Sequence, residues 1–412
     1  MNRTRHFILS PLGSGGDVYP LVAIGRLLRA EGCAVSVVTM DYFKQSVEAA
    51  GLEASTYGSM AEFDELVADP RLWKPFQGTH LVFDAAVRYA KDGFEAISAV
   101  RRHGSTIVAP ATHFGARLAR ERWGLPLVTV HLQPVSLLSA YDFPVLHLNL
   151  AWMAKLPLWF RRMLMRLPSP VEAMARPRLQ RLCSEVGVLP PKRLIPNWWH
   201  SPDGNLALFP PEIGPPQPDW PFNTFQHTFP LEDLAREQGL PHELQRFLEA
   251  GDKPVVFTAG TGNRHAKDFF ASAVQAAVKL GVRAVLCTRH LPDIPEQLPP
   301  QVIGCEYAPF SLLLPKCRVL VHHGGIGTLS QAWRAGIPQL ITPLAHDQPD
   351  NAVRVRERGI GDYLSHRKAL NPSLLAKALN RLISMPMRNR CPNDLSPAPL
   401  LDWLLDVKKQ GA

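Results

Sequence analysis

The chain has 412 residues, of which 46% are hydrophobic and 20% are charged. This length predicts two domains, and the composition supplies enough apolar side chains for sizeable cores and excludes a mainly disordered chain. The formal net charge of +9 points to an anionic partner, which is a nucleic acid, an acidic lipid or a phosphorylated small molecule.

The sequence shows no targeting or membrane-spanning segment. No run approaches roughly 18 consecutive apolar residues, so we expect no transmembrane helix. The basic N-terminus is followed only by the short apolar run Phe7–Leu9, which is too short for the core of a signal peptide. The six cysteines include no C-x-x-C pair, and we therefore expect reduced thiols in a cytoplasmic protein.

The first half of the chain alternates strand and helix patterns. An apolar strand at His6–Ser10 leads into the glycine-rich turn Gly13–Asp17, and a helix with apolar residues at helical spacing runs from there to Gly32. Further buried strands are expected at 34–39, 106–109 and 126–130, with a helix at 117–123. This alternation predicts an α/β domain with a parallel sheet.

Prolines are concentrated in the middle of the chain. Twelve of the 39 prolines lie between positions 190 and 241, and the run Pro210–Pro221 is too rich in proline for regular structure. We interpret this run as a stiff connector. The predicted division is an acceptor-binding domain at 1–235, a donor-binding domain at 236–388, and a C-terminal segment at 389–412 whose helix packs back toward the first domain.

The strand and helix rhythm then restarts. Strands are expected at 254–258, 283–288, 318–321 and 339–341, and helices at 267–280, 328–334 and 351–358. The predicted fold class is therefore α/β, with two Rossmann-like, doubly wound domains that face each other across a cleft. In such sheets ligands bind at the carboxyl ends of the strands, so the cleft is the expected site.

The turn Gly13–Asp17 is the first candidate site. Its glycines let the backbone approach a ligand, and the helix start that follows offers N–H donors at Ser14 and Gly15. The dinucleotide fingerprint is not met, because Val18 stands where the third glycine belongs. Asp17 has two readings of equal weight, as a helix cap and as a general base at the cleft.

The motif His322–Thr328 is the second candidate site. Gly324, Gly325 and Gly327 with the hydroxyl of Thr328 would form a backbone cradle for a diphosphate, to which His322 could donate a hydrogen bond. The alternatives are a core histidine and a zinc site with His346 and Asp347. Two adjacent histidines on a strand point to opposite faces, which disfavours a shared metal, and no D-x-D motif signals a bridging metal.

The stretch from 150 to 167 is aromatic, rich in methionine and basic. One reading is a core helix with a charged outer face. The other is an apolar pocket for an acceptor or a contact with a membrane surface. Nothing in the chain resembles a nucleic-acid-binding module, so we expect no nucleic-acid partner.

Three motifs, at 13–20, 322–328 and 343–352, resemble those of the family 1 nucleotide-sugar glycosyltransferases, which have the GT-B fold. Shorter segments, including 69–75, 137–140 and 307–309, are similar to the rhamnosyltransferases of rhamnolipid synthesis. The resemblance implies Asp17 as catalytic base. It also implies a donor site made of these residues: Ser14, Gly15, Thr261, Tyr307, Ala308, His322, Gly324, Gly325, Gly327, Thr328, Asp347 and Gln348.

Individual roles follow from the same resemblance. Thr261 is implied in the phosphate site, Tyr307 stacks on the pyrimidine while the backbone of Ala308 contacts its edge, and Asp347 and Gln348 hold sugar hydroxyls. The sequence departs from the plant relatives where their ribose-binding glutamate corresponds to Ser330, which favours a deoxyribose and hence a dTDP-sugar. It departs again at 108–113, where no acid is available to support the base.

The resemblance implies transfer of L-rhamnose from dTDP-L-rhamnose to the hydroxyl of a lipid-like acceptor such as a 3-(3-hydroxyalkanoyloxy)alkanoate. The reaction would invert the anomeric centre, with neither a metal nor a bound cofactor. The alternatives are another nucleotide sugar, a small hydrophobic acceptor, a sugar-nucleotide epimerase and a silent partner subunit. A peripheral contact with the inner membrane is a further expectation.

Overall fold

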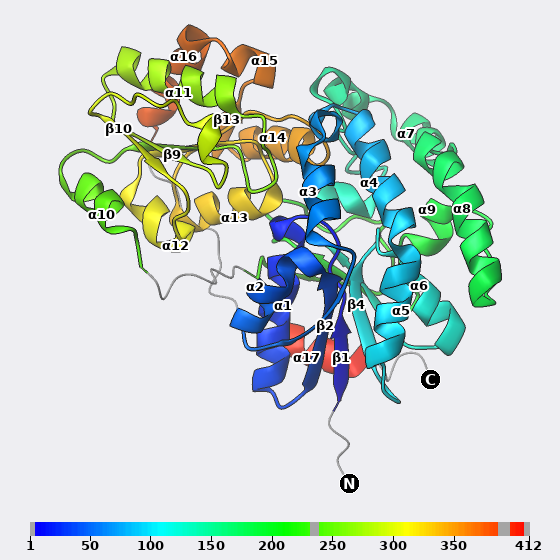
Figure 1. The fold of residues 1–412 in the computed structure, drawn as a ribbon. Helices are drawn as coiled ribbons and strands as arrows, with labels where there is room; N and C mark the ends of the chain where they lie inside the picture. Colours follow the sequence, from blue (N-terminus) through cyan, green and yellow to red (C-terminus); the bar gives the residue numbers. More distant parts are fainter. Residues whose placement is uncertain (1–4, 231–238, 386–395, 408–412) are drawn as a thin grey trace.

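Two parallel β-sheets, each covered by helices, make up this computed structural model, which describes residues 5–230, 239–385 and 396–407 (Figure 1). The first sheet belongs to the N-terminal half and the second to the C-terminal half. The predicted fold class, two doubly wound α/β domains, is confirmed. The predicted boundaries at 235/236 and 388/389 lie outside the described residues.

The N-terminal sheet has seven strands, all parallel, in the order β3-β2-β1-β4-β5-β6-β7. The strands are β1 (His6–Leu9), β2 (Ala34–Met40), β3 (Glu53–Tyr57), β4 (Thr106–Pro110), β5 (Leu127–His131), β6 (Asn205–Leu208) and β7 (Thr224–His227). The order changes direction between β1 and β4, which marks the carboxyl end of β1 as a ligand position.

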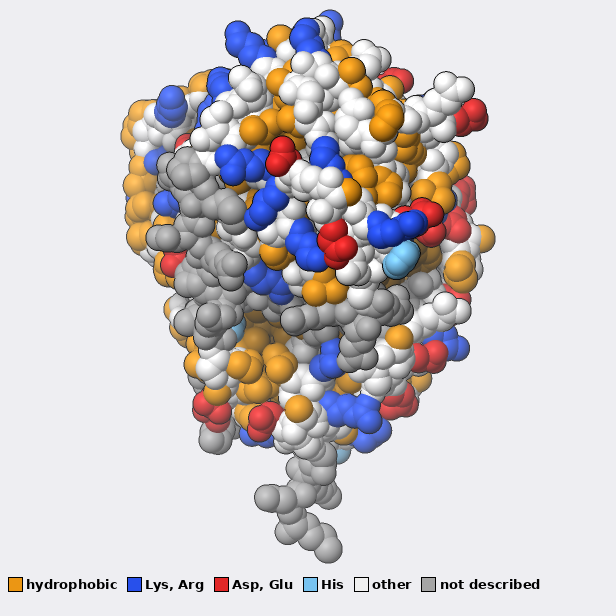
Figure 2. Space-filling model, turned by 90° about the vertical axis from the view of Figure 1, so that its left-hand side faces the viewer, with side chains coloured by type: hydrophobic (Ala, Val, Ile, Leu, Met, Phe, Trp, Pro, Cys, Tyr) orange, Lys and Arg blue, Asp and Glu red, His pale blue; other side chains and the backbone are white. Residues whose placement is uncertain are grey.

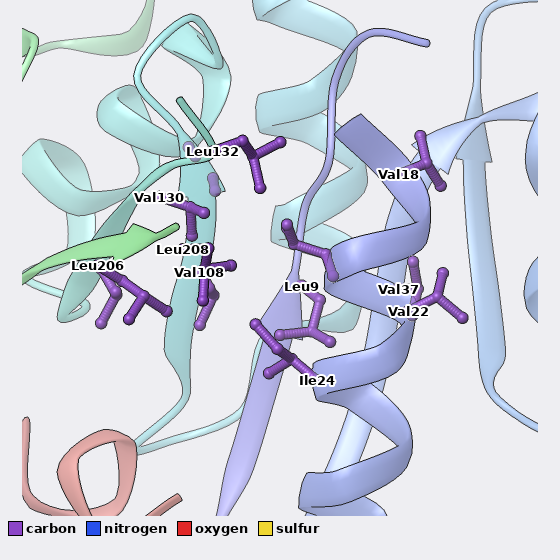
Figure 3. Packing of buried hydrophobic residues seen from close by; sticks show 14 of the residues in the cluster. Leu9, Val18, Val22, Ile24, Val37, Val108, Val130, Leu132, Leu206 and Leu208 are labelled. Carbon is purple, nitrogen blue, oxygen red and sulfur yellow. The ribbon is translucent and has the colours of Figure 1, made fainter. Parts of the chain in front are cut away.

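The helices of this half cover both faces of the sheet (Figure 1). They are α1 (Gly15–Ala30), α2 (Lys44–Ala49), α3 (Met60–Ala68), α4 (Gln77–Arg88), α5 (Ala90–Val100), α6 (Phe114–Trp123), α7 (Leu158–Arg166), α8 (Pro170–Val186) and α9 (Leu194–Trp198). In Figure 3, Ile24 of α1 lies beside Leu9 of β1, and both side chains are fully buried. Gly25 permits this approach, because a Cβ there would lie 2.8 Å from methyl groups of Leu9 and Leu52.

The C-terminal sheet has six parallel strands in the order β10-β9-β8-β11-β12-β13. They are β8 (Val255–Thr258), β9 (Ala284–Cys287), β10 (Val302–Cys305), β11 (Val319–His322), β12 (Gln339–Ile341) and β13 (Gly361–Tyr363). The helices around it are α10 (His242–Glu249), α11 (Lys267–Leu280), α12 (Phe310–Leu313), α13 (Ile326–Ala335), α14 (Gln348–Glu357), α15 (His366–Ala369) and α16 (Pro372–Ile383). Here the order changes direction between β8 and β11.

The proline-rich stretch is not the inter-domain connector that the sequence predicts. It contains β6 and β7, which belong to the N-terminal sheet, and the loop between them packs onto the first domain. Ile213 in that loop is fully buried, and a Cβ on Gly214 would lie 2.6 Å from the ring of Pro134. The prolines are tolerated because they occupy the irregular segments beside these short strands.

The last described helix, α17 (Ala398–Asp406), packs on the N-terminal domain. Trp403 stacks on Phe225 of β7, with ring centroids 5.2 Å apart and planes 13° apart. Leu400 and Leu404 are buried in the same core as β1. The helix therefore ties the end of the chain to its beginning.

Arg354 of α14 fixes the C-terminal domain to the N-terminal one. Its guanidinium lies 2.6 Å from an oxygen of Asp350, 2.8 Å from an oxygen of Asp142 and 3.2 Å from the carbonyl of Ile213. Asp350 also accepts a hydrogen bond from the N–H of Val145 at 3.0 Å. Asp350 is fully buried, so its carboxylate depends on these partners.

Replacement of Arg354 by methionine keeps the apolar stem and leaves the two carboxylates without a cation. Because breaking a buried pair strands an uncompensated charge, we expect Arg354→Met to lower the free energy of unfolding by about 3 kcal/mol. Urea denaturation at pH 7.5 measures this loss. The control is Arg381→Met, which removes an exposed arginine whose partner Asp362 lies 3.8 Å away, and it should change stability by less than about 1 kcal/mol. Equal effects of the two variants would contradict the account.

Candidate functional site

The loop after β1 positions Asp17 at the start of α1. The N–H of Ser14 donates to Asp17 Oδ2 at 2.7 Å, and the Ser14 hydroxyl donates to the same oxygen at 3.1 Å. Burial raises the pKa of Asp17, and the hydrogen bonds from Ser14 oppose that rise. Both bonds fall on Oδ2, which leaves Oδ1 to receive a proton. The capping role is thus observed, and it orients the carboxylate for the second role that the sequence suggests.

Two helix N-termini face each other across the cleft. A Cβ on Gly327 of α13 would lie 3.7 Å from the Cα of Gly16 in α1, and a Cβ on Gly15 would lie 3.6 Å from Thr261 Oγ1. The first turn of each helix carries N–H donors without an intrahelical partner, and each N-terminus carries a partial positive charge. The predicted residues Gly15, Thr261 and Gly327 are therefore brought together in an arrangement suited to an anion. Ser14 is beside them, but its N–H and its hydroxyl both donate to Asp17.

His322 does not point into this arrangement. Its ring is fully buried, Nε2 lies 3.0 Å from the Gln339 Oε1 that it donates to, and Nδ1 accepts from the N–H of Gly324 at 3.2 Å. Burial lowers the pKa of His322 to about 3, so the ring is neutral. The predicted hydrogen bond from His322 to a diphosphate is wrong in this geometry, because both ring nitrogens are engaged. The ring instead holds the loop at Gly324, and it is not free to bind zinc.

His323, which the sequence does not single out, is the histidine of the cleft. Its ring packs against the backbone of two glycines, because a Cβ on Gly260 or on Gly325 would lie 2.5 Å from it. Its Nδ1 is buried and has no hydrogen-bond partner. Burial, and then the charge of His346, lower the pKa of His323 to about 4. A neutral imidazole can donate one hydrogen bond to an anion on this side of the cleft.

Trp73, on the 3₁₀ turn Pro70–Trp73, reaches the same loop from the N-terminal domain. Its ring would lie 3.4 Å from a Cβ on Gly262 and stands 6.0 Å from the His346 ring in a T-shaped arrangement. Its Nε1 is buried and has no hydrogen-bond partner. Buried polar groups are normally satisfied, and the nitrogens of Trp73 and His323 are exceptions among the described residues.

His346 links the two domains beside the site. Its Nε2 donates to the carbonyl of Leu72 at 2.9 Å, and its backbone has a φ of 62°, which is unusual for a residue with a side chain. Gly78 stands close by, since a Cβ there would lie 2.9 Å from the His346 ring and 2.0 Å from the Leu72 carbonyl oxygen. The strained loop after β12 thus places the next residue, Asp347, in the cleft.

Asp347 and Gln348 differ in the hydrogen bonds that their side chains already make. Gln348 is buried, and its Oε1 accepts a hydrogen bond from the N–H of Leu344 at 2.8 Å. Its side chain therefore stabilises the loop between β12 and α14. Asp347 accepts from the Asn351 amide at 2.7 Å. Burial, and then the charge of Asp17, raise the pKa of Asp347 to about 7. The two carboxylates therefore interact across the cleft, one from each domain.

This raised pKa makes stability depend on pH. The folded state holds the Asp347 proton more tightly than the unfolded chain, where the pKa is about 3.9, so ionisation costs stability that grows from about pH 4 to about pH 7. We expect Asp347→Asn to raise the free energy of unfolding by about 2 kcal/mol at pH 8 and to leave it nearly unchanged at pH 4. Urea denaturation at both pH values measures the difference, and a larger gain at pH 4 would contradict the assignment.

Tyr307 and Ala308 follow β10, which is an edge strand of the C-terminal sheet. The strands β9 and β8 separate it from β11. The guanidinium of Arg289 lies over the Tyr307 ring, 5.3 Å from its centroid. Ala308 is buried. That Tyr307 stacks on the base of a nucleotide therefore stays a prediction.

Ser330 does not inform the choice between ribose and deoxyribose. It is buried inside α13, and its hydroxyl donates to the carbonyl of Gly327 at 2.8 Å. The inference of a dTDP-sugar from Ser330 is therefore wrong, because this side chain faces the core. The neighbouring Gln331 is partly exposed.

The region from 108 to 113 supplies no acid to Asp17, as the sequence indicates. Its histidine, His113, is buried, accepts from the N–H of Ala116 at 3.0 Å and lies 2.9 Å from the Ser10 hydroxyl. Burial lowers the pKa of His113 to about 4. His113 thus caps α6 and connects it to the end of β1, below the loop that carries Asp17.

The chain is similar in sequence to known glycosyltransferases. Residues 272–395 match the family model of the C-terminal domain of erythromycin biosynthesis protein CIII-like proteins. The O-mycaminosyltylonolide 6-deoxyallosyltransferase of Streptomyces fradiae is 27% identical over 390 residues, which cover 92% of this chain and 90% of that protein. The sterol 3-beta-glucosyltransferase of Candida albicans is 26% identical along 90% of this chain, which spans 25% of the length of that protein.

Solved structures agree along the whole chain. A calicheamicin glycosyltransferase superposes with a TM-score of 0.72 at 22% identity and covers 100% of both chains. A spinosyn rhamnosyltransferase in complex with thymidine diphosphate superposes with a TM-score of 0.63 at 17% identity, over 99% of this chain and 96% of the other. The chain therefore shares the fold of these glycosyltransferases, which is GT-B. In this fold the two Rossmann-like domains face each other, as the helix ends of α1 and α13 do here.

The sequence therefore predicts most of the glycine framework of the GT-B cleft and misses two of its polar side chains. Trp73 lies within a segment that carries the resemblance, but nothing in the sequence shows that its nitrogen lacks a partner. His323 directly follows His322, for which the sequence predicts the donor role. Strand alternation indicates that one of the two histidines faces the cleft and does not say which.

Proposed function

We propose that the protein is an inverting glycosyltransferase that transfers a hexose from a nucleoside-diphosphate sugar to the hydroxyl of an apolar acceptor. The observation that carries this proposal is the convergence of the α1 and α13 N-termini with His323 at the carboxyl ends of β1, β8 and β11. The two helix ends supply positive potential for a diphosphate without a bridging metal ion. Asp17 lies in the first turn of α1, on the N-terminal domain's side of the cleft, where an acceptor hydroxyl would approach.

The reaction is a direct displacement at the anomeric carbon. The acceptor oxygen forms the new glycosidic bond while the bond to the diphosphate oxygen breaks, and the diphosphate leaves with the electron pair. The hydroxyl proton passes to Asp17 Oδ1. An ordinary carboxylate is a weak base for an alcohol, and the burial that raises the pKa of Asp17 makes it a stronger one.

For the donor we propose dTDP-L-rhamnose. The support comes from the relatives, since a neighbour of the fold is a rhamnosyltransferase solved with thymidine diphosphate. For the acceptor we propose a hydroxyacyl compound of the 3-(3-hydroxyalkanoyloxy)alkanoate type. Its apolar character is supported by the relatives that act on sterols and on macrolides, and its negative charge suits a chain of net charge +9.

Incubation of the purified protein with dTDP-L-rhamnose, dTDP-glucose or UDP-glucose, each with and without the hydroxyacyl acceptor, tests this function by mass spectrometry. We expect a rhamnosylated acceptor only when dTDP-L-rhamnose and acceptor are both present. Conversion of the sugar nucleotide without acceptor would identify an epimerase instead. Nucleotide binding without any product would identify a silent partner subunit.

A further inference from the structure

An apolar and basic surface stands on the outer side of the N-terminal domain. It is formed by the 3₁₀ segment η4 (Leu148–Lys155) and by α7, and neither element contains a buried residue. Trp152 is 58% exposed, Trp159 is 67% exposed and Met163 is 44% exposed. The reading of this stretch as a core helix is therefore wrong. We call these two elements the α7 surface; Figure 1 shows α7 at the edge of the molecule beside α8.

One face of α7 combines apolar and basic side chains. Trp159, Arg162, Met163 and Arg166 follow one another at helical spacing, and all four are exposed. Arg162 also lies over the Tyr141 ring, 5.0 Å from its centroid, which anchors the helix to the domain. A surface helix of a globular protein normally turns its apolar stripe inward, whereas α7 turns tryptophan and methionine outward between arginines.

The charge of this surface is of one sign. No aspartate or glutamate occurs between Asp142 and Glu172, and those two acids are already paired with Arg354 and Arg193. The same stretch contains four basic residues, Lys155, Arg161, Arg162 and Arg166. On the face of the molecule drawn in Figure 2, by contrast, basic side chains are interspersed with acidic ones. The α7 surface is thus complementary to an anionic plane.

The surface borders the candidate site. Phe76 is 56% exposed, and its ring stacks on His147, 6.3 Å away, just before η4 begins. Two residues further along, Gly78 lies against the ring of His346. A layer that contacted Phe76 and the α7 surface would therefore lie close to the cleft.

We propose that the α7 surface docks the protein on an anionic lipid bilayer. Tryptophan is favoured at the boundary between headgroups and acyl chains, where its ring is apolar and its N–H remains hydrated. Arginine and lysine place their stems against the apolar layer and their charges among lipid phosphates. Within the described residues no helix is long and apolar enough to cross a membrane, so the contact is peripheral. This inference concerns binding alone and does not depend on glycosyl transfer.

Co-sedimentation with phosphatidylcholine vesicles, with and without phosphatidylglycerol, tests the proposal on the full chain. We expect binding to the anionic vesicles and little binding to the neutral ones. Trp159→Ser with Met163→Ser should lower the partition coefficient about tenfold or more, and Lys155→Glu with Arg166→Glu should do the same. Arg162 is left unchanged because of its contact with Tyr141.

Two matched controls carry the same chemical changes elsewhere. Leu189→Ser with Phe222→Ser alters two side chains that are 89% and 98% exposed, and Arg367→Glu with Lys368→Glu alters two exposed charges on α15. Both controls should bind vesicles as the unmodified chain does. Equal losses in the controls, or no binding of the unmodified chain at low salt, would overturn the proposal. Light scattering gives a further test. If the unmodified chain self-associates, and the Trp159→Ser and Met163→Ser pair abolishes self-association but not vesicle binding, the surface is a protein interface and the proposal is overturned.

Discussion

Asp17→Asn is expected to fold and to bind the nucleotide normally while kcat falls by a factor of about 10²–10⁴. An asparagine oxygen can accept the hydrogen bond that Asp17 Oδ2 accepts from the N–H of Ser14, so the start of α1 is preserved. The amide cannot take the proton of the acceptor hydroxyl. Single-turnover kinetics at saturating donor, together with calorimetric titration of dTDP, separate turnover from binding.

Ser14→Ala is the control that separates the two roles of Asp17. It removes the 3.1 Å bond from the serine hydroxyl and keeps the 2.7 Å bond from the backbone. A lost cap lowers the free energy of unfolding by about 1 kcal/mol, and we expect kcat to stay within a few-fold of the unmodified value. If Asp17→Asn also kept kcat within a few-fold, Asp17 would be a cap alone.

His323→Ala is expected to lower kcat by a factor of about 10²–10³, because in the proposed reaction this imidazole donates a hydrogen bond to the leaving diphosphate. Its Nδ1 has no hydrogen-bond partner in the described part of the chain, so the substitution should lower stability little through lost hydrogen bonds. Kinetics with the dTDP-sugar and thermal unfolding measure the two effects on the same preparation.

His322→Ala should behave in the opposite way. Its ring is fully buried and bonded to Gln339 and to Gly324, so its loss should appear first as a lower free energy of unfolding, by about 2 kcal/mol. If His322→Ala abolished transfer in a protein of unchanged stability while His323→Ala remained active, the assignment of the two histidines would be reversed.

The sequence predicts helices and strands well where the hydrophobic periodicity of a segment ends at the glycines that flank it. The helix at 267–280 and the strand at 339–341 are observed with the predicted bounds, as α11 and β12. The strands β6 and β7 are missed because each has only four residues and lies among prolines, which outweigh a short apolar run in any local reading. The assignment of those strands to the first sheet depends on tertiary pairing that no local pattern contains.

In the candidate site, too, the sequence predicts the backbone features and does not predict the directions of the side chains. Backbone features such as Gly325 and Gly327 follow from a strand that turns into a helix, and this is visible in the sequence. The direction in which His322, His323, Ser330 and Gln348 point is decided by packing. A single step beyond β11, from His322 to His323, exchanges a core histidine for one that packs against the glycine loops of the cleft, and the sequence does not distinguish the two.

A crystal structure of Asp17→Asn with dTDP bound tests the central claim most directly. We expect the diphosphate between α1 and α13, with phosphate oxygens within about 3.2 Å of the backbone nitrogens of residues 325–327 and of His323 Nδ1. The His322–Gln339 hydrogen bond should remain intact. A diphosphate bound away from both helix ends, or one held by a reoriented His322 with that bond broken, would contradict the account.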